Sequence, residues 1–154
     1  MDYTVPNMKL IPQDRTMSCW YASGQMIIEW RRRTTQSCEL AHPDPAHVAR
    51  WKTLYNDNNG ITNGKILQYA RDLGLRAVPP MSPTPEAIRD WLRAYGPLWV
   101  NGNRHITVIA GIRKKAEVEV LVYDPDKPTA KSGEWRGLNK WYINDGFSGR
   151  DTSA

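Results

Sequence analysis

The chain has 154 residues, the size of one ordinary domain, and its 40% hydrophobic and 24% charged residues are typical of a globular protein rather than a disordered one. The longest apolar run, Ile106 to Ile112, falls far short of the roughly 20 residues that cross a membrane. We therefore expect residues 1–154 to form a single soluble domain without a membrane partner, and residues 147–154 to be a loose tail.

The net charge of +5 raises the question of nucleic-acid binding. Its dense basic runs are residues 31–33, where a helix is expected to end, and residues 113–115, where a hairpin is expected to turn. Cations are favourable at a helix C-terminus, and charge runs are usually solvated. The pattern therefore favours no nucleic-acid partner.

The first half of the chain predicts four helices. Almost every residue from Trp20 to Trp30 is apolar or small, which indicates a buried helix, and Ser18 is a suitable cap that places Cys19 in the first turn. A second helix is expected from Ala46 to about Tyr55. The third follows Thr62 or Asn63 and stops at Gly74; the fourth has Thr84 as cap, Pro85 at its first position, and ends at Gly96.

Beyond Gly96 the apolar period becomes that of strands, which are predicted at Leu98 to Val100, Ile106 to Ile112 and Val118 to Tyr123. Helices followed by strands predict the α+β class. After Pro128 the chain is rich in loop residues, and residues 134–145 show no clear element.

The two cysteines, Cys19 and Cys38, are too few for a disulfide framework, and the N-terminus shows no secretory signal. We therefore expect reduced thiols. A cysteine in the first turn of a helix faces unpaired N–H groups and the positive end of the helix dipole, which favours the thiolate. A nearby imidazole would complete its activation, and the histidines are His42, His47 and His105.

Hairpin geometry favours His105. If the two long strands pair about a tight turn centred between Lys114 and Lys115, His105 lies directly opposite Asp124, and opposed residues share a face of the sheet. A carboxylate beside an imidazole fixes its tautomer and stabilises the imidazolium. A bulge in the turn would shift the register by one and place the two side chains on opposite faces.

The segment QDRTMSCWYAS, Gln13 to Ser23, resembles the nucleophile segment of papain-like cysteine peptidases, in which a Gln precedes the Cys by six positions and a Trp follows it. The resemblance implies a papain-like fold, in which an N-terminal helical half packs on an antiparallel sheet. It assigns Cys19 as nucleophile, His105 as base and Asp124 as the residue that orients it. It also assigns Gln13, with the Cys19 backbone N–H, as the oxyanion hole.

The segments RHITVIAGI and VLVYDP are similar to the His and Asp strands of the compact bacterial branch, which includes injected effector peptidases and bacteriocin leader peptidases. His105 follows Cys19 by 86 positions, fewer than the roughly 130 to 150 of papain, and an Asp stands where papain has Asn. The resemblance implies a cysteine endopeptidase that is the effector domain of a delivered bacterial toxin. It would act in the cytoplasm of a target cell, and an immunity or inhibitor protein would cover its cleft.

The expected chemistry needs no metal or organic cofactor. The seven Trp residues indicate core packing first, but Trp20 and Trp99 are also expected to contact a protein substrate. Cys38, His42 and His47 have a C-x3-H-x4-H spacing, which lacks the close second cysteine of most structural zinc sites. We therefore predict no metal.

Three other functions stay open. The same triad serves deamidases and transglutaminases, which act on Gln side chains and can be separated from a peptidase by mass spectrometry. A catalytically silent peptide-binding module would show equal, slow alkylation of Cys19 and Cys38 near pH 6. A nucleic-acid binder would lose affinity steeply with salt.

Overall fold

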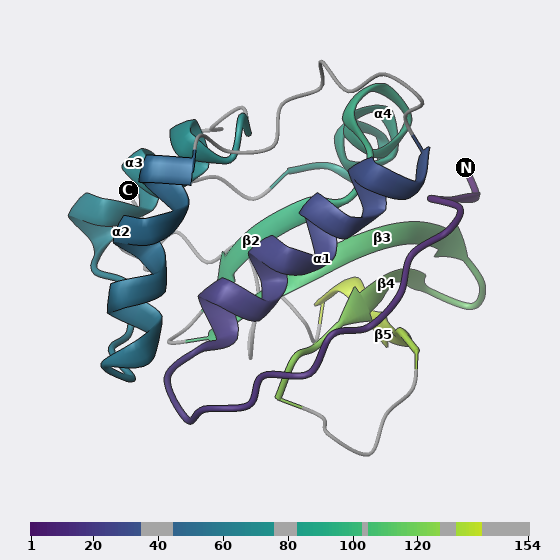
Figure 1. The fold of residues 1–154 in the computed structure, drawn as a ribbon. Helices are drawn as coiled ribbons and strands as arrows, with labels where there is room; N and C mark the ends of the chain where they lie inside the picture. Colours follow the sequence, from purple (N-terminus) through teal and green to yellow (C-terminus); the bar gives the residue numbers. More distant parts are fainter. Residues whose placement is uncertain (35–44, 76–82, 103–104, 127–131, 140–154) are drawn as a thin grey trace.

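The computed structural model describes residues 1–34, 45–75, 83–102, 105–126 and 132–139. Its helices are α1 (Cys19–Thr34), α2 (Pro45–Asn56), α3 (Asn63–Asp72) and α4 (Pro85–Tyr95). Its strands are β1 (Tyr3–Thr4), β2 (Leu98–Gly102), β3 (His105–Lys114), β4 (Val118–Tyr123) and β5 (Glu134–Gly137). Helices and an antiparallel sheet confirm the α+β class (Figure 1).

The helices begin close to where the sequence predicts. Thr84 caps α4, because its hydroxyl accepts a hydrogen bond from the Ala87 N–H at 3.1 Å, and Pro85 occupies the first turn, where its missing N–H costs nothing. Thr62 precedes α3 without a capping hydrogen bond from its side chain. None of the helices in the described ranges is long and apolar enough to cross a membrane.

Ser18 precedes α1 as expected, but its hydroxyl does not cap the helix. Its carbonyl accepts the helical hydrogen bond from the Ala22 N–H at 3.0 Å. Its hydroxyl instead bonds both backbone groups of Arg15, accepting from the N–H at 3.2 Å and donating to the carbonyl at 3.1 Å. The buried Ser18 side chain therefore closes the loop that leads into α1.

Strand β3 is the centre of the sheet. It pairs with β4 on one side, and β4 in turn pairs with β5. On its other side β3 pairs with both β2 and β1: residues 105–109 face β2, and residues 111 and 112 face β1. Helix α1 runs across the sheet in Figure 1 and contacts β2 and β3, so the start of the chain and α1 are both anchored to β3.

The main core lies between α1, α4 and the sheet. The inner face of α1 contributes Met26 and Ile27, and α4 contributes Ile88 and Leu92; all four are at most 2% exposed. They pack on β3 and β4, whose buried apolar residues include Val108, Ile109, Ile112, Val120 and Val122. Burial of these side chains supplies the main driving force for folding, about 1.5–3 kcal/mol for each large aliphatic group.

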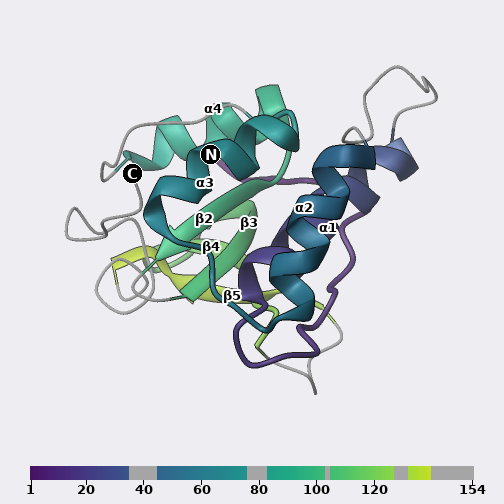
Figure 2. The ribbon, with the colours of Figure 1, turned by 60° about the vertical axis from the view of Figure 1, so that its left-hand side comes forward.

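A second core, rich in aromatic side chains, fastens α2 and α3 to α1. The turned view in Figure 2 shows α2 running beside α1. Trp20 of α1, Trp51 of α2 and Tyr69 of α3 meet edge to face, with ring centroids 5.0 to 6.1 Å apart. Such pairs add about 0.5–1.5 kcal/mol beyond the area they bury. The aromatic core therefore braces the first turns of α1, where Cys19 lies.

Strand β5 corrects the sequence analysis, which found no clear element between residues 134 and 145. Its residues Glu134–Gly137 pair with Glu119 to Val122 of β4. The strand is short and carries charged residues at a sheet edge, a pattern that protects an edge from further pairing but gives a weak strand signal. The predicted tail, residues 147–154, lies outside the described residues.

Replacement of Gly24 by Ala should destabilise the protein. Gly24 is buried on α1, and an added Cβ would coincide with the Tyr69 hydroxyl and lie 2.9 Å from its Cζ. Because the aromatic core fixes the Tyr69 ring, we expect the free energy of unfolding to fall by about 1–3 kcal/mol in urea denaturation.

Gly64→Ala is the matched control. Gly64 lies in α3 with nothing within 4 Å of an added Cβ, so this change should be neutral or stabilise the helix by up to about 1 kcal/mol. Equal stabilities of the two variants would show that α1 and α3 do not approach each other as described.

Candidate active site

Three elements bring the expected catalytic side chains to one end of the molecule. Cys19 begins α1, His105 begins β3, and Asp124 directly follows β4. In Figure 1 the first turn of α1 and the end of β4 lie at the lower left of the fold, with the N-terminal segment passing beside them. The structure thus places the three side chains together.

His105 is held by a hydrogen bond of 2.6 Å between its Nε2 and Oδ1 of Asp124. The Asp124 side chain is 8% exposed and that of His105 is 22% exposed, so the pair is shielded from water. Because Nε2 is engaged by the carboxylate, the other ring nitrogen, Nδ1, is the one available to Cys19. Cys19 is a half-buried free thiol close enough to His105 to raise the pKa of its imidazole.

The hairpin reaches this arrangement by a route that differs from the predicted one. The predicted turn between Lys114 and Lys115 is wrong: Lys114 pairs with Val118, so a connection of three residues, 115–117, joins the strands. That register alone would place His105 and Asp124 on opposite faces. A β-bulge at Ala110 then adds one residue to β3, so that Ile109 pairs with Val122 and Val108 with Tyr123.

The bulge restores the shared face, because a shift of three residues at the turn and an opposite shift of one at the bulge leave an even net shift of two. His105 and Asp124 therefore lie on the same side of the sheet, two positions out of the directly opposed pairing that was predicted. The N-terminal segment holds the bulge in place: the Val5 N–H donates to the Ala110 carbonyl at 2.8 Å, and Thr4 pairs with Gly111. The His105–Asp124 pair thus depends on a contact with residues more than 100 positions earlier in the chain.

Burial opposes a charge on His105 and lowers its pKa, but the hydrogen bonds and the negative charges of Asp124 and Cys19 outweigh it and raise the pKa to about 10. For Asp124, burial raises the pKa, whereas the hydrogen bonds from His105, the Asp126 N–H and Arg136 and the charge of His105 lower it to about 2. At neutral pH the arrangement therefore favours an imidazolium beside an ionised carboxylate.

Arg136 is a residue of this site that the sequence analysis missed. It lies on β5, and its Nη2 donates to Oδ2 of Asp124 at 3.2 Å. Oδ1 of Asp124 also accepts from the Asp126 N–H at 2.9 Å, which closes a turn after β4. The sequence signal for this residue was a basic side chain in the short segment that follows β4 and Asp124. Periodicity cannot show, however, that this segment pairs with β4.

Gln13 reaches the site through its backbone and its amide. Its N–H donates to the Pro125 carbonyl at 2.8 Å, next to Asp124. Its side-chain Nε2 donates to the carbonyls of Arg15 at 2.9 Å and Thr16 at 3.2 Å, and its Oε1 is buried with no hydrogen-bond partner among the described residues. Gln13 thus joins the loop before Cys19 to the loop after β4.

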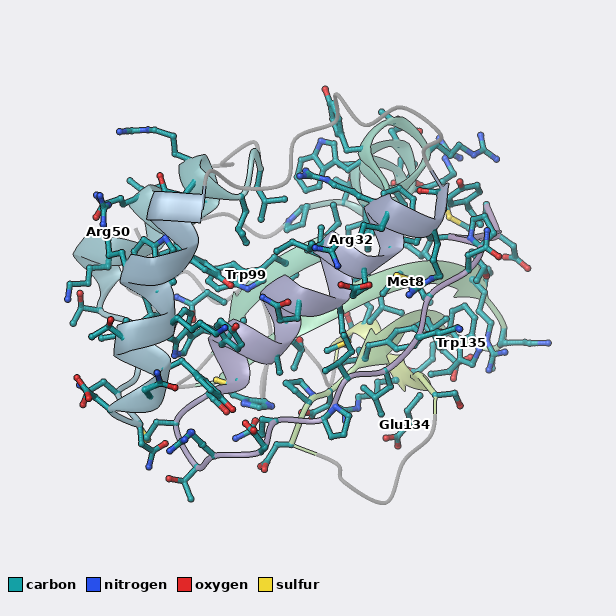
Figure 3. The ribbon with its side chains drawn as sticks, viewed as in Figure 1. Met8, Arg32, Arg50, Trp99, Glu134 and Trp135 are labelled. Carbon is teal, nitrogen blue, oxygen red and sulfur yellow. The ribbon has the colours of Figure 1, made fainter. Side chains whose placement is uncertain are left out.

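The expected substrate contacts divide. Trp20 is fully buried in the aromatic core, and its Nε1 donates to the Asn59 carbonyl at 3.0 Å, so it stabilises the fold instead of reaching a substrate. Trp99 of β2, labelled in Figure 3, is partly exposed and its Nε1 donates to the Trp20 carbonyl at 3.2 Å. Trp99 therefore remains the aromatic candidate beside the nucleophile helix.

Ser23 links the nucleophile helix to the histidine strand. It lies one turn after Cys19 and is fully buried, and its hydroxyl donates to the carbonyl of Ile106, the residue after His105, at 3.2 Å. A buried hydrogen bond at this point fixes the separation of α1 and β3. Sequence reasoning placed Ser23 in the motif but had no means of finding its partner.

Asn58 lies in the loop between α2 and α3 and is another residue that the sequence analysis did not single out. It adopts a positive φ of 53°, which asparagine tolerates. Its Oδ1 accepts from the Met17 N–H at 3.2 Å and its Nδ2 donates to the Thr16 hydroxyl at 3.1 Å. The loop between α2 and α3 thus supports the loop that leads into Cys19.

The alternative metal set cannot be assessed in the structure, because Cys38, His42 and the side chain of His47 lie outside the described residues. Within the described ranges, no three metal-ligating side chains of His, Cys, Asp or Glu gather into a group.

The His105–Asp124 pair should stabilise the fold in a defined pH window. The contribution of His105 is complete below pH 6.5 and is lost as pH rises towards about 10; that of Asp124 is complete above pH 3.8 and is lost as pH falls towards about 2. Asp124→Asn should therefore lower the free energy of unfolding most between pH 3.8 and 6.5, and less at pH 9.

Urea denaturation at these pH values checks the prediction. Asp90→Asn is the control, because Asp90 is 64% exposed and its ion pair with Arg89 should contribute little at any pH. A loss for Asp124→Asn that is the same at pH 5 and pH 9 would contradict the coupling.

Comparison with known proteins places this site in a family. A search of curated proteins gives no match, whereas the family described as "Papain-like cysteine protease AvrRpt2" matches residues 1–144. The match spans all the described elements, from β1 to β5. It agrees with the α+β fold and with the resemblance of the Cys19 segment to papain-like peptidases. The chain belongs to the AvrRpt2 family of papain-like cysteine proteases, and the protein is a hydrolase of that class.

Proposed function

We propose that the protein is an endopeptidase that cleaves protein substrates with Cys19 as nucleophile, His105 as acid and base, and Asp124 as the residue that orients His105. The observation that carries this proposal is the position of His105, whose Nε2 lies 2.6 Å from Oδ1 of Asp124 and whose pKa is raised by both Asp124 and Cys19. A thiol, an imidazole and a carboxylate in this order are the parts of an activated nucleophile.

The reaction follows from these contacts. The Cys19 sulfur attacks the peptide carbonyl carbon, forming a C–S bond and an oxyanion. When the oxyanion collapses, the C–N bond breaks and the leaving nitrogen takes the proton of the His105 imidazolium. Neutral His105 then removes a proton from water, which attacks the thioester. The C–S bond breaks, releasing the acid product and restoring the thiolate–imidazolium pair.

The oxyanion would be bound at the start of α1. The Cys19 N–H is in the first helical turn, whose N–H groups lack intrahelical acceptors, and the helix dipole also favours an anion there. The Nε2 of Gln13 is the proposed second donor. In the free protein it bonds two carbonyls of the preceding loop, and the weaker of these, to Thr16 at 3.2 Å, would be exchanged for the oxyanion when substrate binds.

Cleavage should require each member of the triad. Proteins from cells that express the wild type should show new N-termini that are absent with Cys19→Ala and with His105→Ala, while Asp124→Ala, which leaves His105 without a side chain to orient it, should reduce the rate. Cys38→Ala is the control for loss of a thiol and should cleave normally.

Mass spectrometry of the same samples separates the rival chemistry. A deamidase would add about 1 Da to glutamine-containing peptides without new termini, and that result would replace the peptidase with an acyl transferase that uses the same residues. New termini of equal abundance in wild type and Cys19→Ala would contradict the proposal altogether.

We further propose that the protein acts as a toxic effector in the cytoplasm of a target cell, where reduced thiols keep Cys19 active, and that an immunity or inhibitor protein covers its cleft in the producing cell. The family match and the cysteine chemistry support this role. Expression of the wild type in bacteria should slow their growth, while expression of Cys19→Ala at an equal protein level should not. Growth curves measure the difference; equal growth would argue against toxicity by proteolysis.

A further inference from the structure

Asp124 is held at both carboxylate oxygens. Oδ1 accepts from His105 and from the Asp126 N–H, and Oδ2 accepts from Nη2 of Arg136 at 3.2 Å. The Arg136 side chain is 17% exposed and that of Asp124 is 8% exposed, so water competes little with their ion pair. With both oxygens occupied, the carboxylate cannot rotate about its Cβ–Cγ bond without losing a hydrogen bond to a charged group.

Arg136 has a second carboxylate neighbour, Glu134. The same Nη2 lies 3.4 Å from Oε2 of Glu134, two residues earlier on β5, and Figure 3 labels Glu134 on that strand. The Glu134 carboxylate is 65% exposed, so it holds the guanidinium weakly, and the partly buried Asp124 is the stronger partner. The Arg136 guanidinium is therefore expected to remain paired with Asp124 throughout the reaction.

Catalysis makes this permanent charge useful. While His105 is an imidazolium its positive charge stabilises ionised Asp124, but after Nδ1 gives its proton to the leaving amine only the neutral Nε2–H hydrogen bond remains. Arg136 cannot be deprotonated in a protein, so it keeps a positive charge beside the buried carboxylate through the whole cycle. The charged groups around Asp124 are then His105 from β3, with Cys19 of α1 behind it, and Arg136 from β5, with Glu134 behind it.

We propose that Arg136 is a positioning residue for the peptidase reaction: it holds the Asp124 carboxylate ionised and oriented towards His105 while His105 passes between its charged and neutral forms. This inference rests on the proposed Cys19–His105–Asp124 mechanism, and it assigns to β5 a part in that mechanism. Arg136 acts through Asp124 and touches no substrate.

The test uses the full chain with Arg136→Met, Arg136→Lys, Asp124→Asn and the double variant Asp124→Asn/Arg136→Met. The substrate is a peptide that spans a cleavage site mapped for the wild type. Arg136→Met should lower kcat roughly tenfold with KM within about twofold, because the positioning role concerns the reaction step and not binding. Arg136→Lys keeps a cation and should recover most of the loss.

The double variant separates positioning from general stability. If Arg136 acts through Asp124, adding Arg136→Met to Asp124→Asn should cost almost nothing further. Arg113→Met is the matched control: it removes an arginine ion pair of 2.7 Å with Glu119 from the same sheet, away from Asp124, and should leave kcat unchanged. The proposal would be overturned if kcat were unchanged in Arg136→Met. It would also be overturned if adding Arg136→Met to Asp124→Asn lowered kcat by as much as Arg136→Met does alone.

A second readout needs no substrate. The rate at which iodoacetamide alkylates Cys19 near pH 6, followed by peptide mass so that Cys38 is scored separately, should fall in Arg136→Met and recover in Arg136→Lys. If the wild type alkylates rapidly and shows this pattern but cleaves no peptide, the peptidase proposal fails while Arg136 keeps its role. If the wild type cleaves and Arg136→Met matches it in both assays, the assignment of Arg136 alone fails.

Discussion

His105 and Asp124 meet through a hydrogen bond of 2.6 Å, and most of the features around the candidate active site act to keep that bond in place. The two residues are at the outer ends of β3 and β4, so their approach is set by the register of the whole hairpin. On one side, Ser23 ties β3 to the nucleophile helix. On the other, the backbone of Gln13 ties the N-terminal segment to Pro125.

Helix α1 and the loop that leads into it are held in place by different interactions. The helix α1 is braced by two cores, one against the sheet and one against α2 and α3. The loop before Cys19 is held by hydrogen bonds of moderate length from Ser18, Gln13 and Asn58. Both the helix and the loop before it are held in place, as precise positioning of the Cys19 sulfur for the proposed reaction requires.

The sequence predicted local features well, since helix caps and apolar periods depend on neighbouring residues. Thr84 and Pro85 mark the start of α4 by their own chemistry, and Cys19 begins α1. His105 was predicted to lie directly opposite Asp124 across a turn that the structure moves; the register leaves them two positions apart, and they share a face only because of the bulge at Ala110. Residues 115–117 contain no Gly, Asn or Asp, so the sequence has no turn residue there from which the length of the turn could be predicted.

What could not be predicted depends on contacts between distant segments. The bulge is held by Val5, the loop before Cys19 by Asn58, and the Asp124 carboxylate by Arg136; periodicity within one segment contains none of these pairings. Trp20 shows the reverse failure. A motif placed it beside the nucleophile, but whether a ring faces a substrate or the core is decided by the packing of α2 and α3 against it.

The compensated register of the β3–β4 hairpin limits how this enzyme family can change in length. Insertion or loss of one residue within the paired parts of β3 or β4 would turn the imidazole away from its carboxylate, whereas a change of two, or loss of the bulge residue, would keep them on one face. Natural relatives are therefore expected to vary in this hairpin by even steps. A single-residue difference should be accompanied by a rearranged N-terminal strand, because that strand holds the bulge.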